Sequence, residues 1–335
     1  MRRTALLAAC LASASLGPVP ASAAGTKAAV AVDQGVLQTQ VILDHLGFSP
    51  GVLDGKSGMS LTTAVKGFQE ANGLDVNGTL DKSTQTAMAK YQSIPATQTV
   101  TLTPELLAGP YTNPLPKSPA KQADLPELGY RNAMEKFGEM FHTTPAVLIA
   151  LNSADTKLSP GVKITVPNAI ATARDYDPKL PEKWRQTLSG LNVDSQQPQG
   201  AKIVVDKSDQ VLRVLDADGK LVAQFQATMG SKHDPLPIGT WKILGPAYNP
   251  PFHYNPKLFW DAKKGEKKAT LPPGPNGPVG VVWLDLSKPH YGIHGTPEPS
   301  TIGRAESHGC IRLTNWDVAR LSLMIKPGTP AVFQE

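Results

Sequence analysis

A cysteine stands at the centre of the residues best suited to chemistry in this 335-residue sequence. Residues 307–313 spell Ser-His-Gly-Cys-Ile-Arg-Leu, with the thiol at Cys310, and His294 lies sixteen positions before it. A free thiol has a pKa near 8.5, so it needs a base to become a nucleophile at neutral pH. Histidine is the side chain whose pKa suits that task. The spacing therefore predicts a cysteine nucleophile paired with a histidine.

Two histidines are candidates for the base. His308 is two positions from Cys310, and side chains so close along a strand or turn often point apart. His294 ends an apolar segment and could return across a hairpin to face the thiol. We therefore expect His294 to be the base.

Glycines flank both candidate residues. Gly295 and Gly309 allow close backbone approach and unusual backbone angles. The N–H groups around Gly309 could point at a developing oxyanion, and one such donor contributes about 3 kcal/mol to lowering the barrier. A helix is expected to open at residues 315–317 and to continue through Leu321 and Met324.

Short β-rich segments would position this motif. They lie at residues 203–205, 210–215, 221–228, 241–244, 279–286 and 331–333, and residues 216–219 form a hairpin-type turn. Residues 245–278 hold many prolines and aromatics, and a long irregular loop in a compact domain is usually a lid or a binding loop. These patterns predict a mainly-β catalytic domain.

The motif resembles a known family. His-Gly-Thr at 294–296, followed by the 307–313 segment, is the signature of the L,D-transpeptidase (YkuD-type) catalytic domain. Further matching positions lie at 230–231, 235–240, 274–280 and 283–284. The resemblance covers residues 201–335 and implies a mainly-β fold.

The resemblance also implies roles for the site residues. Cys310 would be the nucleophile and His294 the proton donor and acceptor, while Ser307, His308 and Gly309 would shape the site and its oxyanion hole. Arg312 would bind a substrate carboxylate in bidentate fashion, although other family members carry Asn at that position.

The implied reaction is transfer of a peptidoglycan stem peptide. The thiol would attack the carbonyl after the third residue of a tetrapeptide and release D-alanine, and an amine of a neighbouring stem would resolve the acyl-enzyme. This would serve cell-wall biogenesis and cell shape, through cross-linking or through anchoring of a protein. Hydrolysis at the same site and a catalytically silent wall-binding protein are the alternatives. A papain-like protease is excluded because the upstream cysteine motif of that family is missing.

Residues 33–93 form a separate, helical pattern. Apolar residues at helical spacing alternate with turns such as Asp54-Gly55 and Asn77-Gly78. The segment resembles a peptidoglycan-binding domain of type 1, and the matching positions include Leu37, Leu46, Gly47, Ala64, Val65, Phe68, Gln69, Gly73, Leu74 and Leu80. We expect a small all-α domain.

Two connections separate a further small unit. Residues 94–128 are rich in proline and are expected to be a linker, as are residues 169–200. Between them, residues 129–168 resemble a LysM module with both helix and strand, on the matches at 151–152, 160–161 and 166–167. A helical spacer is the alternative.

The first 23 residues have the pattern of a secretory signal peptide. Two arginines precede an apolar stretch, and residues 21–23 fit a cleavage site. Glycine and prolines interrupt the stretch, so a membrane anchor is disfavoured. Cleavage would leave Cys310 as the one cysteine of an exported protein, which we expect in the periplasm. Lipidation at Cys10 is the minor alternative.

The charge favours acidic partners without naming one. The net charge is +5 and the sequence pI is near 9.0, but no stretch interleaves clustered Arg and Lys with aromatics, so nucleic acid is not expected. Peptidoglycan stem peptides and glycan are the expected partners, and the oligomeric state stays open. No metal-ligand spacing or phosphate-binding loop occurs, so we expect no cofactor. Trp283, Tyr291 and Trp316 are expected in the core.

Overall fold

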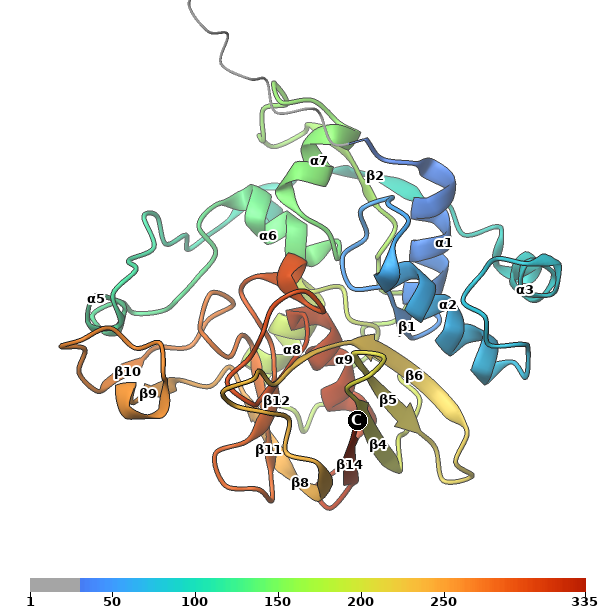
Figure 1. The fold of residues 1–335 in the computed structure, drawn as a ribbon. Coiled ribbons are helices and arrows are strands. Elements are labelled where there is room, and N and C mark those ends of the chain that lie inside the picture. Colours follow the sequence, from blue (N-terminus) through green and yellow to red (C-terminus); the bar gives the residue numbers. More distant parts are fainter. Residues whose placement is uncertain (1–30) are drawn as a thin grey trace, which may run out of the picture.

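The computed structural model describes residues 31–335, so the expected signal peptide and Cys10 lie outside the described residues. Three units follow one another along the chain. One end of the molecule holds α1 (Gln34–His45), α2 (Met59–Ala71), α6 (Ala133–Met140) and α7 (Pro145–Leu151), and the other holds the large sheet with α8 (Glu182–Gly190) and α9 (Asn315–Met324) beside it (Figure 1). In the part described, no helix is long and apolar enough to cross a membrane.

The first unit is helical, as the sequence predicted. Its elements are α1 (Gln34–His45), α2 (Met59–Ala71), α3 (Lys82–Met88) and a short 3₁₀ turn, Ala89–Tyr91. The Asp33 side chain caps α1 by accepting from the N–H of Val36, and Asp81 caps α3 in the same way. Phe48 and Phe68 pack edge to face in the small core of this unit.

This unit also contributes a strand to the C-terminal sheet. The short strand β1 (Phe48–Ser49) pairs in parallel with β6 (Leu221–Gln226) of that sheet. The buried amide of Gln224 adds a hydrogen bond of 2.8 Å to the carbonyl of Thr63 in α2. The helical unit is therefore docked on the sheet by backbone and side-chain contacts.

The second unit combines two strands and two helices. Strands β2 (Thr97–Thr101) and β3 (Lys163–Pro167) pair in antiparallel fashion, with α6 (Ala133–Met140) and α7 (Pro145–Leu151) between them in sequence. Leu102, Phe137 and Val166 are among the residues of its buried core.

The two expected linkers are more ordered than their proline content suggested. β2 lies within 94–128, because its alternating Thr and Val residues favour a strand once β3 is present to pair with it. Prolines begin α4 (Pro104–Leu107) and α5 (Pro119–Ala123), since proline is tolerated in the first helical turn. Residues 169–200 contain α8 (Glu182–Gly190), whose Trp184 is fully buried in the core of the third unit.

The third unit is mainly β, which confirms the expected fold class. Its sheet has the order β1-β6-β5-β4-β14-β8-β11-β12-β13-β7. The strands not yet named are β4 (Lys202–Asp206), β5 (Val211–Leu215), β7 (Thr228–Met229), β8 (Gly239–Tyr248), β11 (Val282–Leu286), β12 (Gly292–His294), β13 (Ile311–Arg312) and β14 (Pro330–Gln334). A separate hairpin of β9 (Phe252–Tyr254) and β10 (Ala269–Leu271) lies next to α5 (Figure 1).

One helix packs across the sheet behind the predicted motif. α9 (Asn315–Met324) begins at Thr314, whose hydroxyl accepts from the N–H of Asp317. Trp316 of this helix is fully buried, as expected, and its ring stacks on His142 of the second unit at 5.1 Å. The helix that follows the motif is therefore covered by the second unit.

Candidate active site

His294 and Cys310 lie on neighbouring parallel strands. His294 ends β12 and is the register partner of Arg312 in β13, and Cys310 immediately precedes β13. Alternate residues of a strand share a face, so Cys310, Arg312 and His294 lie on one face of the sheet. The expected hairpin return is wrong: residues 295–310 form a crossover, which parallel strands require.

His294 is held as a neutral imidazole. Its side chain is buried, and Nδ1 lies 2.7 Å from the carbonyl oxygen of Gly295. A carbonyl can only accept, so Nδ1 carries the hydrogen and Nε2 keeps its lone pair. Burial lowers the pKa of His294 to about 3, and the charge of Arg312 adds to this. The ring stacks on Trp283 at a centroid distance of 5.4 Å.

Cys310 is a free, partly buried thiol. Burial raises its pKa, against the opposing effects of the backbone N–H of Gly292 and the charge of Arg312. Its Sγ lies 3.8 Å from the carbonyl oxygen of His290, a contact that suits a protonated thiol. The resting pair is therefore a thiol and a neutral imidazole, not a thiolate and an imidazolium.

Ser307 and Gly309 fix the turn that presents the thiol. The buried Ser307 hydroxyl donates to the carbonyl of Cys310 at 2.7 Å and accepts from the N–H of Gly230 at 2.7 Å. Gly309 has φ of +90°, and a Cβ there would lie 2.7 Å from the Tyr291 ring. Both the backbone angle and the contact require glycine.

His308 points away from the thiol, toward the loop between β9 and β10. Its Nε2 lies 2.8 Å from Oδ1 of Asp261, and its ring meets Phe259 and Trp260 at centroid distances of 5.0 and 5.7 Å. Trp260 also stacks on His233 at 4.5 Å. Residues 259–261 therefore cover the motif, as a lid or binding loop would.

Arg312 brings the one guanidinium of the motif beside both reactive residues. Its Nη1 donates a long hydrogen bond of 3.4 Å to the carbonyl of Glu306, and burial lowers its pKa. Its charge disfavours protonation of His294 and favours the Cys310 thiolate. A guanidinium in this position can pair with a carboxylate.

Sequence reasoning missed three neighbours of the site. Trp283 and Tyr291 were expected in the core, but both are only partly buried: Trp283 covers His294 and Tyr291 packs against Gly309. The third neighbour is Asp234, whose negative charge raises the pKa of the Cys310 thiol. For Trp283, strand alternation with Leu284 and Leu286, which are buried, was the available signal.

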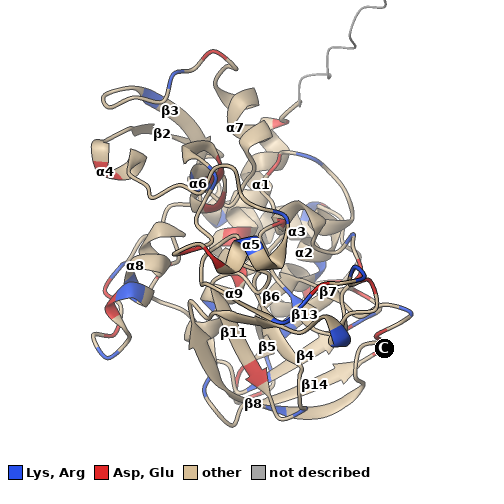
Figure 2. Ribbon diagram, turned by 90° about the vertical axis from the view of Figure 1, so that its left-hand side faces the viewer, with Lys and Arg blue, Asp and Glu red and all other residues tan. Residues whose placement is uncertain are grey.

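Charge and metal ligands do not mark the site. In the view of Figure 2, acidic and basic residues are both scattered along loops and helices. Among residues 31–335, no three His, Cys, Asp or Glu side chains lie close enough together to hold a metal ion.

Comparison with known proteins places two families on the chain. Residues 200–333 match the L,D-transpeptidase catalytic domain, and residues 32–88 match a peptidoglycan binding domain. A Bacillus licheniformis protein, YkuD, provisionally classed as an L,D-transpeptidase, is 58% identical over 57 residues, which are 17% of this chain and 34% of that protein. YqjB of Bacillus subtilis, classed in the same way, is 28% identical over 132 residues, 38% of this chain and 67% of that protein.

Among solved structures, an L,D-transpeptidase from Mycobacterium smegmatis is 25% identical, with 40% of this chain and 58% of that chain covered and a TM-score of 0.32. The match spans about a third of the length of the Bacillus licheniformis YkuD protein and of a second YkuD relative, from Bacillus subtilis. Residues 200–333 are thus an L,D-transpeptidase catalytic domain, joined in one chain to a peptidoglycan-binding domain at residues 32–88.

Proposed function

We propose that this protein is an exported L,D-transpeptidase that joins peptidoglycan stem peptides through an acyl-enzyme on Cys310. The observation that carries the proposal is the pairing of β12 with β13. It sets a neutral imidazole, with Nε2 unprotonated, on the same sheet face as the one thiol of the described chain.

In the first half-reaction, Sγ of Cys310 attacks the carbonyl carbon between the third stem residue and the terminal D-alanine. Nε2 of His294 takes the thiol proton as the bond forms, because the raised pKa of the thiol leaves it protonated beforehand. The N–H groups around His308, Gly309 and Cys310 receive the developing oxyanion. His294 then protonates the leaving amine, and D-alanine departs.

In the second half-reaction, the amine of a neighbouring stem attacks the thioester carbonyl. His294 accepts the proton of that amine and returns it to Sγ as the C–S bond breaks. Arg312 would bind a stem carboxylate and so orient the donor. The same site could attach a protein through an amine of that protein.

The other units would hold the enzyme on its polymeric substrate. The peptidoglycan-binding domain is docked on the catalytic sheet through β1, so binding to the wall would bring the site with it. We propose that residues 129–168, which hold α6, α7 and β3, form the LysM-like module, extended by β2 through its pairing with β3. We also propose that the protein acts in the periplasm after removal of residues 1–23.

Release of D-alanine from a disaccharide-tetrapeptide tests this function. With a second stem as amine acceptor, we expect D-alanine release and a cross-linked product of matching yield, and neither with Cys310→Ala. Release without cross-linked product would instead identify an L,D-carboxypeptidase. Absence of release from the wild-type protein would favour a silent wall-binding protein.

A further inference from the structure

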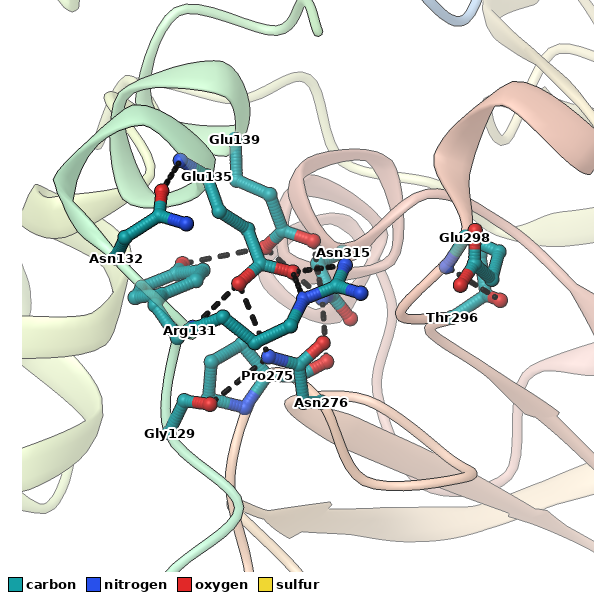
Figure 3. Close-up of polar contacts among 11 residues, drawn as sticks. Gly129, Arg131, Asn132, Glu135, Glu139, Pro275, Asn276, Thr296, Glu298 and Asn315 are labelled. Atoms are coloured by element: carbon teal, nitrogen blue, oxygen red, sulfur yellow. Dashed lines mark hydrogen bonds and ion pairs between the residues drawn. The ribbon is translucent and has the colours of Figure 1, made fainter. Parts of the chain in front are cut away.

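A side chain of the second unit is bonded directly to the helix that follows the Cys310 motif. Nδ2 of Asn315, the first residue of α9, lies 2.9 Å from each carboxyl oxygen of Glu139 in α6. Figure 3 shows Glu139 reaching from its helix toward Asn315, with Pro275 and Asn276 below them. Two residues 176 positions apart, in different units, therefore share a buried polar contact.

Asn315 in turn packs against the backbone that holds His294. Its Oδ1 accepts from the N–H of Val281 at 3.2 Å. A Cβ added to Gly280 or Gly295 would lie 2.0 or 2.2 Å from the same oxygen. The carbonyl of Gly295 is the acceptor for Nδ1 of His294. The Asn315 amide therefore packs directly against the Gly295 peptide, whose carbonyl orients the imidazole.

Glu139 has no alternative partner in water. It is 5% exposed, and its second described donor is the hydroxyl of Tyr130, 3.2 Å from Oε2. The segment before α6 is hydrogen-bonded to the loop at residues 273–276 of the catalytic domain. Nδ2 of Asn276 donates to the carbonyl of Gly129 at 2.8 Å, and the N–H of Leu128 donates to the carbonyl of Pro273 at 2.9 Å.

We propose that Glu139 is a positioning residue for His294, acting through Asn315, so that the catalytic base is correctly oriented only while the second unit is docked. This rests on the proposed function, in which His294 moves the protons. Loss of the Glu139 carboxyl removes the two shortest hydrogen bonds of the Asn315 amide and leaves it held by the carbonyl of Pro275 and the N–H of Val281, each at 3.2 Å. The loosened amide then shifts against Gly295, whose carbonyl orients His294. A misplacement of about 1 Å from a distant change can cost a hundredfold in rate.

The Glu139 carboxyl is suited to this task because hydrogen-bond donors reach both of its oxygens. Burial raises its pKa to about 8, against hydrogen bonds from Asn315 and Tyr130, and the nearby charge of Glu135 adds to the increase. Tyr130, Glu135 and Arg131, which pairs with Glu135, are the titratable or charged groups around it. Glutamine keeps the shape and an acceptor oxygen, so Glu139→Gln is the matched conservative variant.

The test reads the His294 ring directly. The full chain is labelled with ¹⁵N-histidine, and His294→Gln assigns its resonances. We expect Glu139→Ala to shift the Nδ1–H signal and speed its exchange with water. Glu139→Gln should leave both as in wild type at pH 7. Glu135→Gln is the control: it lies on the same helix and contacts Asn276, but it does not touch Asn315.

The kinetic readout is the acylation rate with the tetrapeptide. Glu139→Ala should lower it by about tenfold to a hundredfold with little change in KM, with rescue in Glu139→Gln. Unaltered His294 signals and rates in Glu139→Ala would overturn the inference.

If that variant does not fold, the pH dependence of the His294 signals is the test. In the wild type, the His294 signals should change near pH 8 as Glu139 ionises, and in Glu139→Gln they should not. Identical pH titrations of the His294 signals in the two proteins would also overturn the inference. If wild type is not acylated, the proposed function fails, and the spectra still decide the role of Glu139.

Discussion

The Ser307 hydroxyl joins the carbonyl of Cys310 to the N–H of Gly230, with both hydrogen bonds at 2.7 Å. Ser307 is 2% exposed and Gly230 is buried, so the N–H of Gly230 has no water to bond to instead. This side chain therefore ties the turn that carries the nucleophile to the residue after β7.

Ser307→Ala should weaken both the fold and the site. Leaving the buried N–H of Gly230 and the partly buried carbonyl of Cys310 unpaired costs about 1–3 kcal/mol each at most, so we expect a lower free energy of unfolding in denaturant titration. We also expect slower acylation of Cys310, because its carbonyl loses its anchor. The exposed Ser300 lies in the same crossover, and Ser300→Ala is the control. Equal stability and equal acylation rate in Ser307→Ala and Ser300→Ala would refute the role of the Ser307 hydroxyl.

The thiol should react as an ordinary, not an activated, cysteine in the free enzyme. Because burial raises the pKa of Cys310, alkylation by iodoacetamide should increase with pH to a midpoint above the usual value of about 8.5. Mass spectrometry of the modified peptide measures the rate, and Cys310→Ser corrects for other sites. A midpoint below about 7.5 would indicate a preformed thiolate and contradict the neutral pair.

The contact between Asp261 and His308 should hold the lid over the site. Asp261→Ala removes the 2.8 Å contact and should raise KM for the tetrapeptide by about twofold to fivefold, the scale of an exposed ion pair. Asp261→Asn keeps an acceptor oxygen and should lie closer to wild type. Lys264→Ala, in the same loop, serves as a neutral control. If Asp261→Ala has the same KM as wild type, the loop that carries Asp261 does not contribute to substrate binding.

His294, whose pKa is lowered to about 3, should raise the free energy of unfolding as pH rises to about 6.5, in wild type and variant alike. Glu139 should lower the free energy of unfolding between about pH 4.5 and 8. Its pKa is about 8 in the folded protein against an ordinary 4.5, so the folded state binds more protons in this window. Glu139→Gln should remove this contribution in denaturant titrations at pH 5, 6.5 and 8. Asp317, with a pKa raised to about 6, acts in the same direction in both proteins. Parallel profiles for wild type and variant would refute a neutral buried Glu139.

The sequence predicted the elements that are defined locally. The helices of the first unit and most strands of the third follow from periodicity and turn residues, and the motif around Cys310 is contiguous except for His294. The contacts that complete the site are of another kind. Asp261 and Glu139 reach it only because a hairpin and a docked helix bring them there, and neither carries a local signal in the chain.

The pairing of segments was also beyond local reasoning. Residues 94–128 were predicted to be a linker because the partner of strand β2 lies more than sixty residues later, in β3. The hairpin expected between His294 and Cys310 assumed antiparallel neighbours, whereas the two strands run parallel. Strand partners depend on tertiary packing, which a pattern of residue types does not specify.

The central claim is that Cys310 carries the acyl group and that His294 moves the protons. Intact mass of the purified protein, with and without a disaccharide-tetrapeptide, tests it most directly. We predict a mass gain equal to the tetrapeptide donor less D-alanine, located on Cys310, absent in Cys310→Ala and formed about a hundredfold or more slowly in His294→Gln. No adduct on the wild-type protein, or an adduct that survives Cys310→Ala, would contradict this account.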